Sequence, residues 1–424
     1  MAESLFPALA HRNFRLLWIG LLISMTGSLM QNAAILWHVS LLVSPERKAL
    51  ALGMVGLVRV APVVFFSMLS GVVADVWDRR KLMLLTQSAA TVVATLLAVL
   101  TYRGLTHLWP VYLLSALGAA AGSFDLPARQ ALVPMLVPRK HLPNAISLNS
   151  IMFQTASVIG PSIGGLLIGN AGLVWVYALN AVSFMFVIAA LLMMRGVPNR
   201  SEETGARKNE ISWRAAMEGL SFVFRSPLIR STMILDFLAT FFASATTLLP
   251  IFAQDILRVG PKGYGWLYAA PAVGALITSM IIAPFTDRIR HRGLVLLYGV
   301  SFYGVANVVF GLSRSFGLTF FCLAMIGVTD TVSTIIRNII RQLETPDHMR
   351  GRMTGVNMVF FMGGPQLGEF EAGLVANWLG APISVITGGL GCLAATGWIW
   401  AKTPSLRQYD RDQNRYTSDG GNKP

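Results

Sequence analysis

The chain has 424 residues, of which 54% are hydrophobic and only 13% charged, whereas soluble globular domains carry roughly 25% charged residues. This composition excludes a soluble fold and predicts an all-α membrane protein. The formal charge of +14 would suit a nucleic-acid ligand, but in a membrane protein basic residues must first be tested as topology signals.

Twelve segments are long and apolar enough to cross a bilayer, which takes about 20 mainly apolar residues. The first is too long for a signal-peptide core, so we interpret it as a retained span. Polar side chains within the fifth, tenth and eleventh segments are expected to face the interior of the bundle. The predicted transmembrane helices have approximate limits of 16–41, 49–74, 82–101, 109–128, 145–168, 173–194, 228–255, 264–285, 294–313, 316–340, 353–376 and 381–401.

The Lys and Arg residues outside these segments are distributed unevenly. If both termini are cytoplasmic, the cytoplasmic side receives most of them, including Arg79–Lys81 and the connection 195–230. The opposite side keeps only Arg47, Lys48, Arg103, Arg258, Lys262 and Arg314. The positive-inside rule therefore predicts that both termini are cytoplasmic, and it accounts for the basic charge without a nucleic-acid partner.

One long polar connection divides the spans six and six. Its second part predicts an amphipathic helix on the membrane surface, whose apolar face consists of Trp213, Met217, Leu220 and Phe224. We predict an N-terminal half (1–195), a cytoplasmic linker (196–227), a C-terminal half (228–402) and a disordered tail (403–424).

The two halves share sequence features, which predicts two six-helix pseudo-repeats. A loop with a small residue, an Asp and a basic cluster occurs at Gly71, Asp75, Arg79 and Arg80 and has a degenerate copy at Asp287 and Arg288. Three further residues recur 208 positions later, namely Arg129, Pro138 and Asn149 as Arg337, Pro346 and Asn357. Internal duplication is typical of transporter folds, in which the binding site lies between the repeats near the bilayer midplane.

With these features the chain resembles the major facilitator superfamily over nearly its whole length. Within it, the chain looks like the drug:proton antiporters that include the enterobactin exporter and the macrolide efflux proteins. Four motifs carry this resemblance: Gly71-x-x-x-Asp75-x-x-x-Arg79-Arg80, Asp125-Leu-Pro127-Ala-Arg129, Gly160-Pro161-x-x-Gly164-Gly165 and Gly364-Pro365-x-x-Gly368-Glu369. The chain departs from the usual loop pattern at Val76 and Asp78, and reads Gly27-Ser28 where many relatives have an acidic residue.

The resemblance implies a gate at the loop that contains Asp75. A carboxylate there can cap a helix or pair with Arg79 and Arg80, and the implied partner is the start of span eleven near Arg352. The alternative is that the arginines are topology signals and that Asp75 ends a helix.

The Gly160, Pro161, Gly164 and Gly165 run removes a backbone donor and several Cβ atoms from the middle of span five. Span five can therefore bend and approach a neighbouring helix closely. A role in coupling and plain helix packing remain equally open interpretations.

Charged residues inside spans are costly and are candidates for function. The resemblance implies a cavity lined by spans one, four, seven and ten, so we expect Asp236 and Asp330 to bind protons or cations there. The further candidates are Arg59, Glu369 and, as polar lining, Gln31 and Asn32. The alternative for each is a structural ion pair, such as Asp330 with Arg337, or Arg59 with Glu369 or Glu371.

We therefore expect a monomeric secondary transporter in an inner membrane that exports amphipathic small molecules, such as drugs or a siderophore, in exchange for protons. A lysophospholipid flippase of the same fold is the main alternative. The sequence has no phosphate-binding Gly-x-x-x-x-Gly-Lys motif and no cluster of nucleophile, base or metal ligands in the spans. We accordingly expect no cofactor, no metal site and no enzymatic activity, and no disulfide between Cys322 and Cys392.

Overall fold

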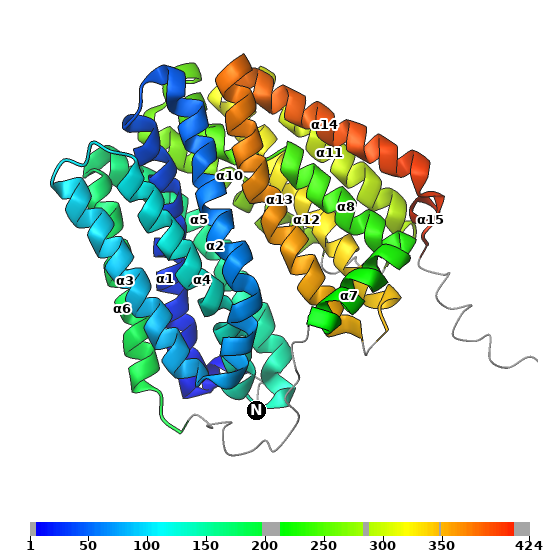
Figure 1. Ribbon diagram of the computed structural model, residues 1–424, viewed down its shortest axis with the longest axis horizontal. Helices are drawn as coiled ribbons and strands as arrows, with labels where there is room; N and C mark the ends of the chain where they lie inside the picture. The colour runs from blue at the N-terminus through cyan, green and yellow to red at the C-terminus, as the bar shows by residue number, and fades with distance from the viewer. Residues whose placement is uncertain (1–5, 197–212, 283–287, 347–348, 411–424) are drawn as a thin grey trace, which may run out of the picture. The chain divides into compact units, whose positions relative to one another are not determined.

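The computed structural model describes residues 6–196, 213–282, 288–346 and 349–410, and every regular element in these ranges is a helix (Figure 1). In the first half of the chain the long helices are α1 (Arg12–Leu41), α2 (Lys48–Val76), α3 (Arg79–Tyr102), α4 (Trp109–Leu132), α5 (Leu142–Asn170) and α6 (Leu173–Met193). In the second half they are α7 (Trp213–Arg225), α8 (Pro227–Phe242), α10 (Gly260–Ile282), α11 (Arg292–Leu312), α12 (Phe316–Glu344), α13 (Arg350–Leu379) and α14 (Ala381–Lys402).

Eleven of the helical segments within the described ranges are long and apolar enough to cross a membrane. The remaining predicted span, the eleventh (353–376), corresponds to α13, which has 30 residues and so a length of about 45 Å at 1.5 Å per residue. Its polar side chains, such as Gln366 and Glu369, lower its hydropathy. The predicted all-α membrane fold is confirmed.

The seventh predicted span is not one continuous helix, which corrects the prediction for 228–255. Helix α8 ends at Phe242 and is followed by a 3₁₀ turn (Ala245–Leu248), the short α9 (Leu249–Ile251) and a π-helical turn (Phe252–Ile256). Pro250 lacks the amide hydrogen that a regular helix would donate to the carbonyl four residues earlier, so the backbone changes its hydrogen-bond pattern around it.

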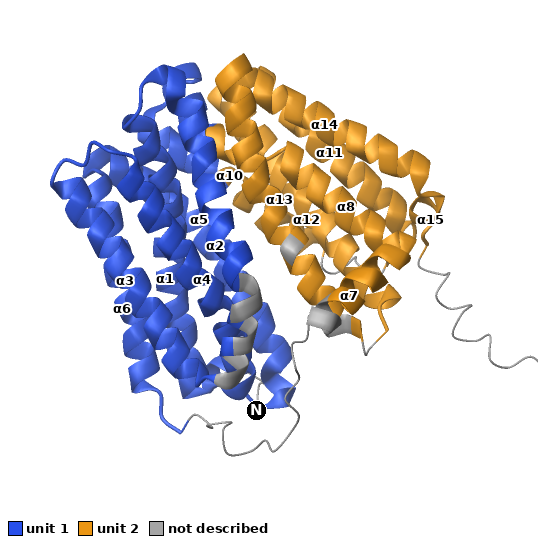
Figure 2. Ribbon diagram, viewed as in Figure 1, with its two compact units in different colours: residues 1–209, 249–269 blue, residues 210–248, 270–424 orange. Residues whose placement is uncertain are grey.

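Two compact units divide the chain (Figure 2). Unit 1 contains residues 1–209 and 249–269, and unit 2 contains residues 210–248 and 270–424. The two units therefore differ from the predicted halves in one segment, because residues 249–269 pack with the N-terminal half. Contacts inside unit 1 explain this: the hydroxyl of Tyr264 donates to the Ala33 carbonyl at 2.8 Å, and Lys48 pairs with Asp255 at 3.0 Å.

The helix packing of the two units follows the predicted duplication. In unit 1, α1 packs against α5 and α6, and α3 packs against α4 and α6; in unit 2, α8 packs against α13 and α14, and α11 against α12 and α14. Gly172 and Gly380, 208 residues apart, precede α6 and α14 with φ of 91° and 89°, a backbone region that glycine adopts without strain. The two six-helix repeats are thus visible in packing and in backbone conformation.

The linker helix forms as predicted, but its protein-facing side differs from the predicted apolar face. Val223 is 1% exposed and lies in a core cluster with Ile229, Met233 and Met353, whereas Met217 and Phe224 are 46% and 47% exposed. Met217 and Phe224 of the predicted face are thus exposed and do not pack in the core of unit 2, while Leu220 is partly buried. Placement of α7 at the membrane surface remains a prediction.

The predicted disordered tail is wrong for its first residues. The short α15 (Pro404–Arg407) leads into Tyr409, and Leu406 and Tyr409 are 0% and 3% exposed in the core of unit 2. The Tyr409 hydroxyl lies 3.0 Å from a Glu344 carboxylate oxygen. Composition predicted disorder because the segment is polar overall, but these two apolar side chains fit the ends of α11 and α12. Residues 411–424 lie outside the described ranges.

Candidate functional site

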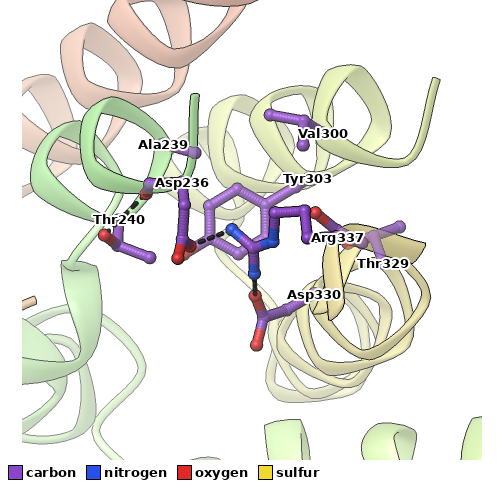
Figure 3. A pocket seen from close by; sticks show the side chains of 9 residues that line it. Asp236, Ala239, Thr240, Val300, Tyr303, Thr329, Asp330 and Arg337 are labelled. Atoms are coloured by element: carbon purple, nitrogen blue, oxygen red, sulfur yellow. Dashed lines mark hydrogen bonds and ion pairs between the residues drawn. The ribbon is translucent and has the colours of Figure 1, made fainter. Parts of the chain in front are cut away.

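Three charged side chains meet inside unit 2 (Figure 3). Arg337 of α12 forms a direct ion pair with Asp236 of α8, and these side chains are 3% and 4% exposed. The second terminal nitrogen of Arg337 lies 3.7 Å from a carboxylate oxygen of Asp330, about two turns earlier on α12. The Asp330 side chain is 51% exposed. One guanidinium is therefore shared between a buried and an accessible carboxylate.

A small cavity adjoins this triad. It has a free volume of about 10 Å³, which is near the minimum for one water molecule. Figure 3 shows the charged groups converging on it from α8 and α12. Its lining is Asp236, Ala239, Thr240, Val300, Tyr303, Thr329, Asp330, Ser333 and Arg337.

Further polar side chains lie around the triad on α12 and α13. Arg337 also donates to the Thr334 hydroxyl at 2.7 Å. One turn further along α12, the buried Arg341 donates to the side-chain oxygens of Asn338 and Asn357. Asn357 is one of the predicted repeat residues, so the repeat signal identified a contact of this region.

The structure brings together the two carboxylates predicted to bind protons, Asp236 and Asp330. The alternative pairing of Asp330 with Arg337 is also present, whereas the closer Asp236–Arg337 pair was missed. Arg337 itself had been singled out only as the copy of Arg129. Two residues 101 positions apart cannot be matched from local sequence patterns. The predicted Glu369 lies on α13, partly buried and with an interaction of its own, and has no part in the triad's ion pairs.

The remaining predicted cavity residues, Arg59, Gln31 and Asn32, lie in unit 1 and are partly buried. The Gln31 side-chain oxygen accepts from Asn180 of α6 at 2.8 Å. Two turns along α1, a ring nitrogen of the buried His38 lies 3.1 Å from the Tyr177 hydroxyl. These contacts form a polar seam between α1 and α6.

A partly buried carboxylate in unit 1 was not predicted as a site. Asp125 of α4 accepts hydrogen bonds from Thr86 at 3.0 Å and Gln87 at 2.8 Å, both on α3. Asp125 was visible in the sequence as the first residue of the motif that ends at Arg129. Because Asp125 lies inside a predicted span, its charge could have marked it as a candidate functional residue.

The glycine run of α5 does lie at close helix contacts. A Cβ at Gly160 would lie 2.7 Å from the Thr26 carbonyl of α1, and one at Gly165 would lie 2.6 Å from the Pro261 carbonyl of α10. Gly164 faces Met30 at 3.0 Å, and Pro161 lies within the continuous helix α5. These contacts agree with the expected close approach, and a role in coupling stays a prediction.

Part of the predicted gate is described. Asp78 caps α3 by accepting from the backbone amides of Arg80 and Lys81, the Arg80 side chain donates to the Leu192 carbonyl at 3.2 Å, and Arg79 contacts the Met135 sulfur at 2.9 Å. Asp78, which departs from the family loop, thus acts as a helix cap.

Other members of the gate give no test of it. The surroundings of Gly71, the side chain of Asp75 and all of Asp287 lie outside the described residues, while Arg288 is exposed. Arg352, the implied partner region, pairs with Glu218 of α7 at 2.6 Å inside unit 2.

Comparison with known proteins agrees with this architecture. The family described as transmembrane secretion effector matches residues 3–418. The enterobactin exporter of one Escherichia coli strain is 27% identical over 353 residues, which is 83% of each chain. That of another strain is 28% identical over 326 residues, or 77% of each chain.

Solved structures share the fold. A bacterial homolog of the human lysosomal transporter Spinster has a TM-score of 0.72 at 13% identity, covering 96% of this chain and 100% of that one. A bacterial homologue of the iron transporter ferroportin has a TM-score of 0.67 at 16% identity, covering 96% and 100%. These relatives and neighbours are transporters and not enzymes, which confirms the predicted class. The chain belongs to the transmembrane secretion effector family of the major facilitator superfamily.

Proposed function

We propose that this transporter exports amphipathic small organic compounds, such as a siderophore or a drug, in exchange for protons. The observation that carries the proton coupling is the sharing of Arg337 between the buried Asp236 and the accessible Asp330. The exporter relatives support the outward direction and the class of substrate. In line with the charge distribution, we place the chain in an inner membrane, as a monomer with both termini in the cytoplasm.

The proton is exchanged at Asp330 in this scheme. Because half of its side chain is exposed and its contact with Arg337 is the longer one, Asp330 can take up a proton without breaking the Asp236 pair. Protonation removes its attraction for the guanidinium, so Arg337 then interacts with Asp236 alone. Loss of the proton restores the shared arrangement. The triad thus has two charge states that a conformational change can be coupled to.

The loop between α2 and α3 is proposed to act as a gate. Arg79 and Arg80 are anchored inside unit 1, at Met135 and at the end of α6, and so hold the loop in position next to Asp75. The second copy of the motif, at Asp287 and Arg288, is proposed to do the same for unit 2.

Uptake into inside-out vesicles tests the proposal. Fluorescent drugs and a siderophore are offered with and without an imposed pH gradient, for the wild type, Asp236→Asn and Asp330→Asn. We expect gradient-driven accumulation in the wild type and its loss in both variants. Asp410→Asn is the matched control, because Asp410 pairs with His291 outside the triad, and it should accumulate substrate like the wild type.

Two results would contradict the proposal. Undiminished gradient-driven accumulation in both variants would remove the triad from coupling. Absence of any accumulation by folded wild-type protein, together with translocation of lysophospholipids in the same vesicles, would support the flippase alternative.

A further inference from the structure

Arg59 lies near the middle of α2, within a segment apolar enough to span the membrane. It is 11 residues, or about 16 Å, from the start of the helix and about 25 Å from its end. Both distances exceed the reach of an arginine side chain. The guanidinium therefore cannot reach the water at either end of the helix by extending along it.

The helical periodicity turns Arg59 toward the protein. Val55 and Leu52, four and seven residues earlier on the same face, are both 0% exposed. Val64 and Phe65, on the opposite side of the helix, are 56% and 69% exposed. Arg59 is therefore on the face of α2 that packs within unit 1 and not on the exposed side of the helix.

Among the described residues of unit 1, no carboxylate pairs with Arg59. Three carboxylates of this unit are engaged with other groups: Asp255 with Lys48, Asp125 with Thr86 and Gln87, and Asp78 with the start of α3. A cation in a membrane span without a counter-ion is costly and marks a site for an anion.

The polar seam described above belongs to the same unit as Arg59. That seam runs along α1 and α6 through His38 and Tyr177 to Gln31 and Asn180. The Gln31 oxygen is occupied by Asn180, while its side-chain nitrogen has no partner among the described residues, so it remains available as a donor. Unit 1 thus contains both the positive charge of Arg59 and a hydrogen-bond donor of the seam.

From this arrangement we infer that Arg59 binds the carboxylate of an anionic substrate. A planar guanidinium can donate two parallel hydrogen bonds to a carboxylate, which is the most favourable pairing available to it. The inference rests on the export function proposed above and narrows its substrate class to organic acids. Neutral analogues would still enter through their apolar parts, with lower affinity.

Binding of matched probes tests the role of Arg59. Purified full-length protein in nanodiscs is titrated with dansylglycine, which carries a carboxylate, and with the uncharged dansylglycinamide, and the dansyl fluorescence is recorded. The wild type should bind the acid at least ten-fold more tightly than the amide. Arg59→Gln should weaken acid binding about ten- to one-hundred-fold, the range of a charge-assisted hydrogen bond, and leave amide binding unchanged. Arg103→Gln is the matched control, since Arg103 is an exposed arginine at the end of α3.

Arg59→Lys is the second variant to be measured, and it replaces Arg59→Gln if that variant does not fold. Lysine preserves the charge but not the paired hydrogen bonds, so the preference for the acid should persist in reduced form. The inference is overturned if the wild type shows no preference for the acid, if Arg59→Gln weakens acid and amide equally, or if Arg59→Lys binds the acid as tightly as the wild type.

Transport in proteoliposomes separates this inference from the proposed function. If the amide is transported along a pH gradient while no acid preference exists, export stands and the role of Arg59 fails. If Arg59 controls acid binding but no probe is transported by the wild type, the anion site stands and the proposed proton-driven export fails.

Discussion

Asp236 and Arg337 lie on different helices, α8 and α12, and form a direct ion pair with only 4% and 3% of their side chains exposed. A pair this deeply buried has a high desolvation cost, so it is weak evidence for stability by itself. Removing one partner is different, because it leaves the other charge buried and uncompensated. The same ion pair therefore affects both the stability of unit 2 and the charge state of its candidate site.

Loss of Arg337 should be strongly destabilising. Arg337→Gln leaves Asp236 without a counter-ion, and we expect a loss of about 3 to 5 kcal/mol. The double variant Asp236→Leu/Arg337→Met, which removes both charges, should regain most of this stability while failing to transport. Thermal unfolding in detergent provides the measurement. A double variant no more stable than Arg337→Gln would mean that the charges themselves stabilise the fold.

Asp330→Asn should abolish proton coupling while leaving the stability of the protein nearly unchanged. Since half of this side chain is exposed and its contact with Arg337 is long, we expect a stability change of less than about 1 kcal/mol. Transport should lose its dependence on the pH gradient, while gradient-independent exchange of substrate persists. Exchange and gradient-driven uptake are measured in the same proteoliposomes. Gradient dependence equal to that of the wild type would exclude Asp330 as the proton site.

Gly265→Ala should destabilise the α5–α10 contact in unit 1. The added Cβ would lie 2.6 Å from the Pro161 carbonyl and 2.8 Å from the Gly165 Cα atom, so both backbones must move apart. Overpacking of this kind costs about 1 to 3 kcal/mol. Gly122→Ala on α4 is the control, because nothing lies within 4 Å of its new Cβ. Equal melting temperatures for the two variants would show that the α5–α10 contact is looser than described.

Tyr409→Ala should destabilise the docked end of the chain. The side chain is 3% exposed and lies in the core cluster of unit 2, so its truncation should cost about 3 to 5 kcal/mol. Tyr409→Phe loses only the hydrogen bond to Glu344 and should cost about 1 kcal/mol. Unfolding midpoints of the two variants are compared. A neutral Tyr409→Ala would mean that residues 404–410 do not contribute to the packing of unit 2.

Hydropathy alone determined most of the fold. A bilayer requires long apolar helices with internally satisfied backbone groups, so each span is a local property that can be identified without knowledge of its neighbours. The duplication could also be identified from the sequence, because the Gly-Pro pair occurs in both repeats, as Gly160-Pro161 and Gly364-Pro365. The same signal identified Arg337 and Asn357 as residues of interest, although not what they contact.

Only the tertiary structure decided which polar groups pair. Asp236 is paired with Arg337 because α8 and α12 place them together, and nothing in the residues around Asp236 indicates that partner. The assignment of 249–269 to unit 1 and the docking of Tyr409 have the same origin, since both depend on contacts between segments far apart in the chain. The sequence determined which segments enter the membrane, since that depends on composition over about 20 residues. Packing determined the candidate site, since ion pairs form over a few ångströms between distant positions.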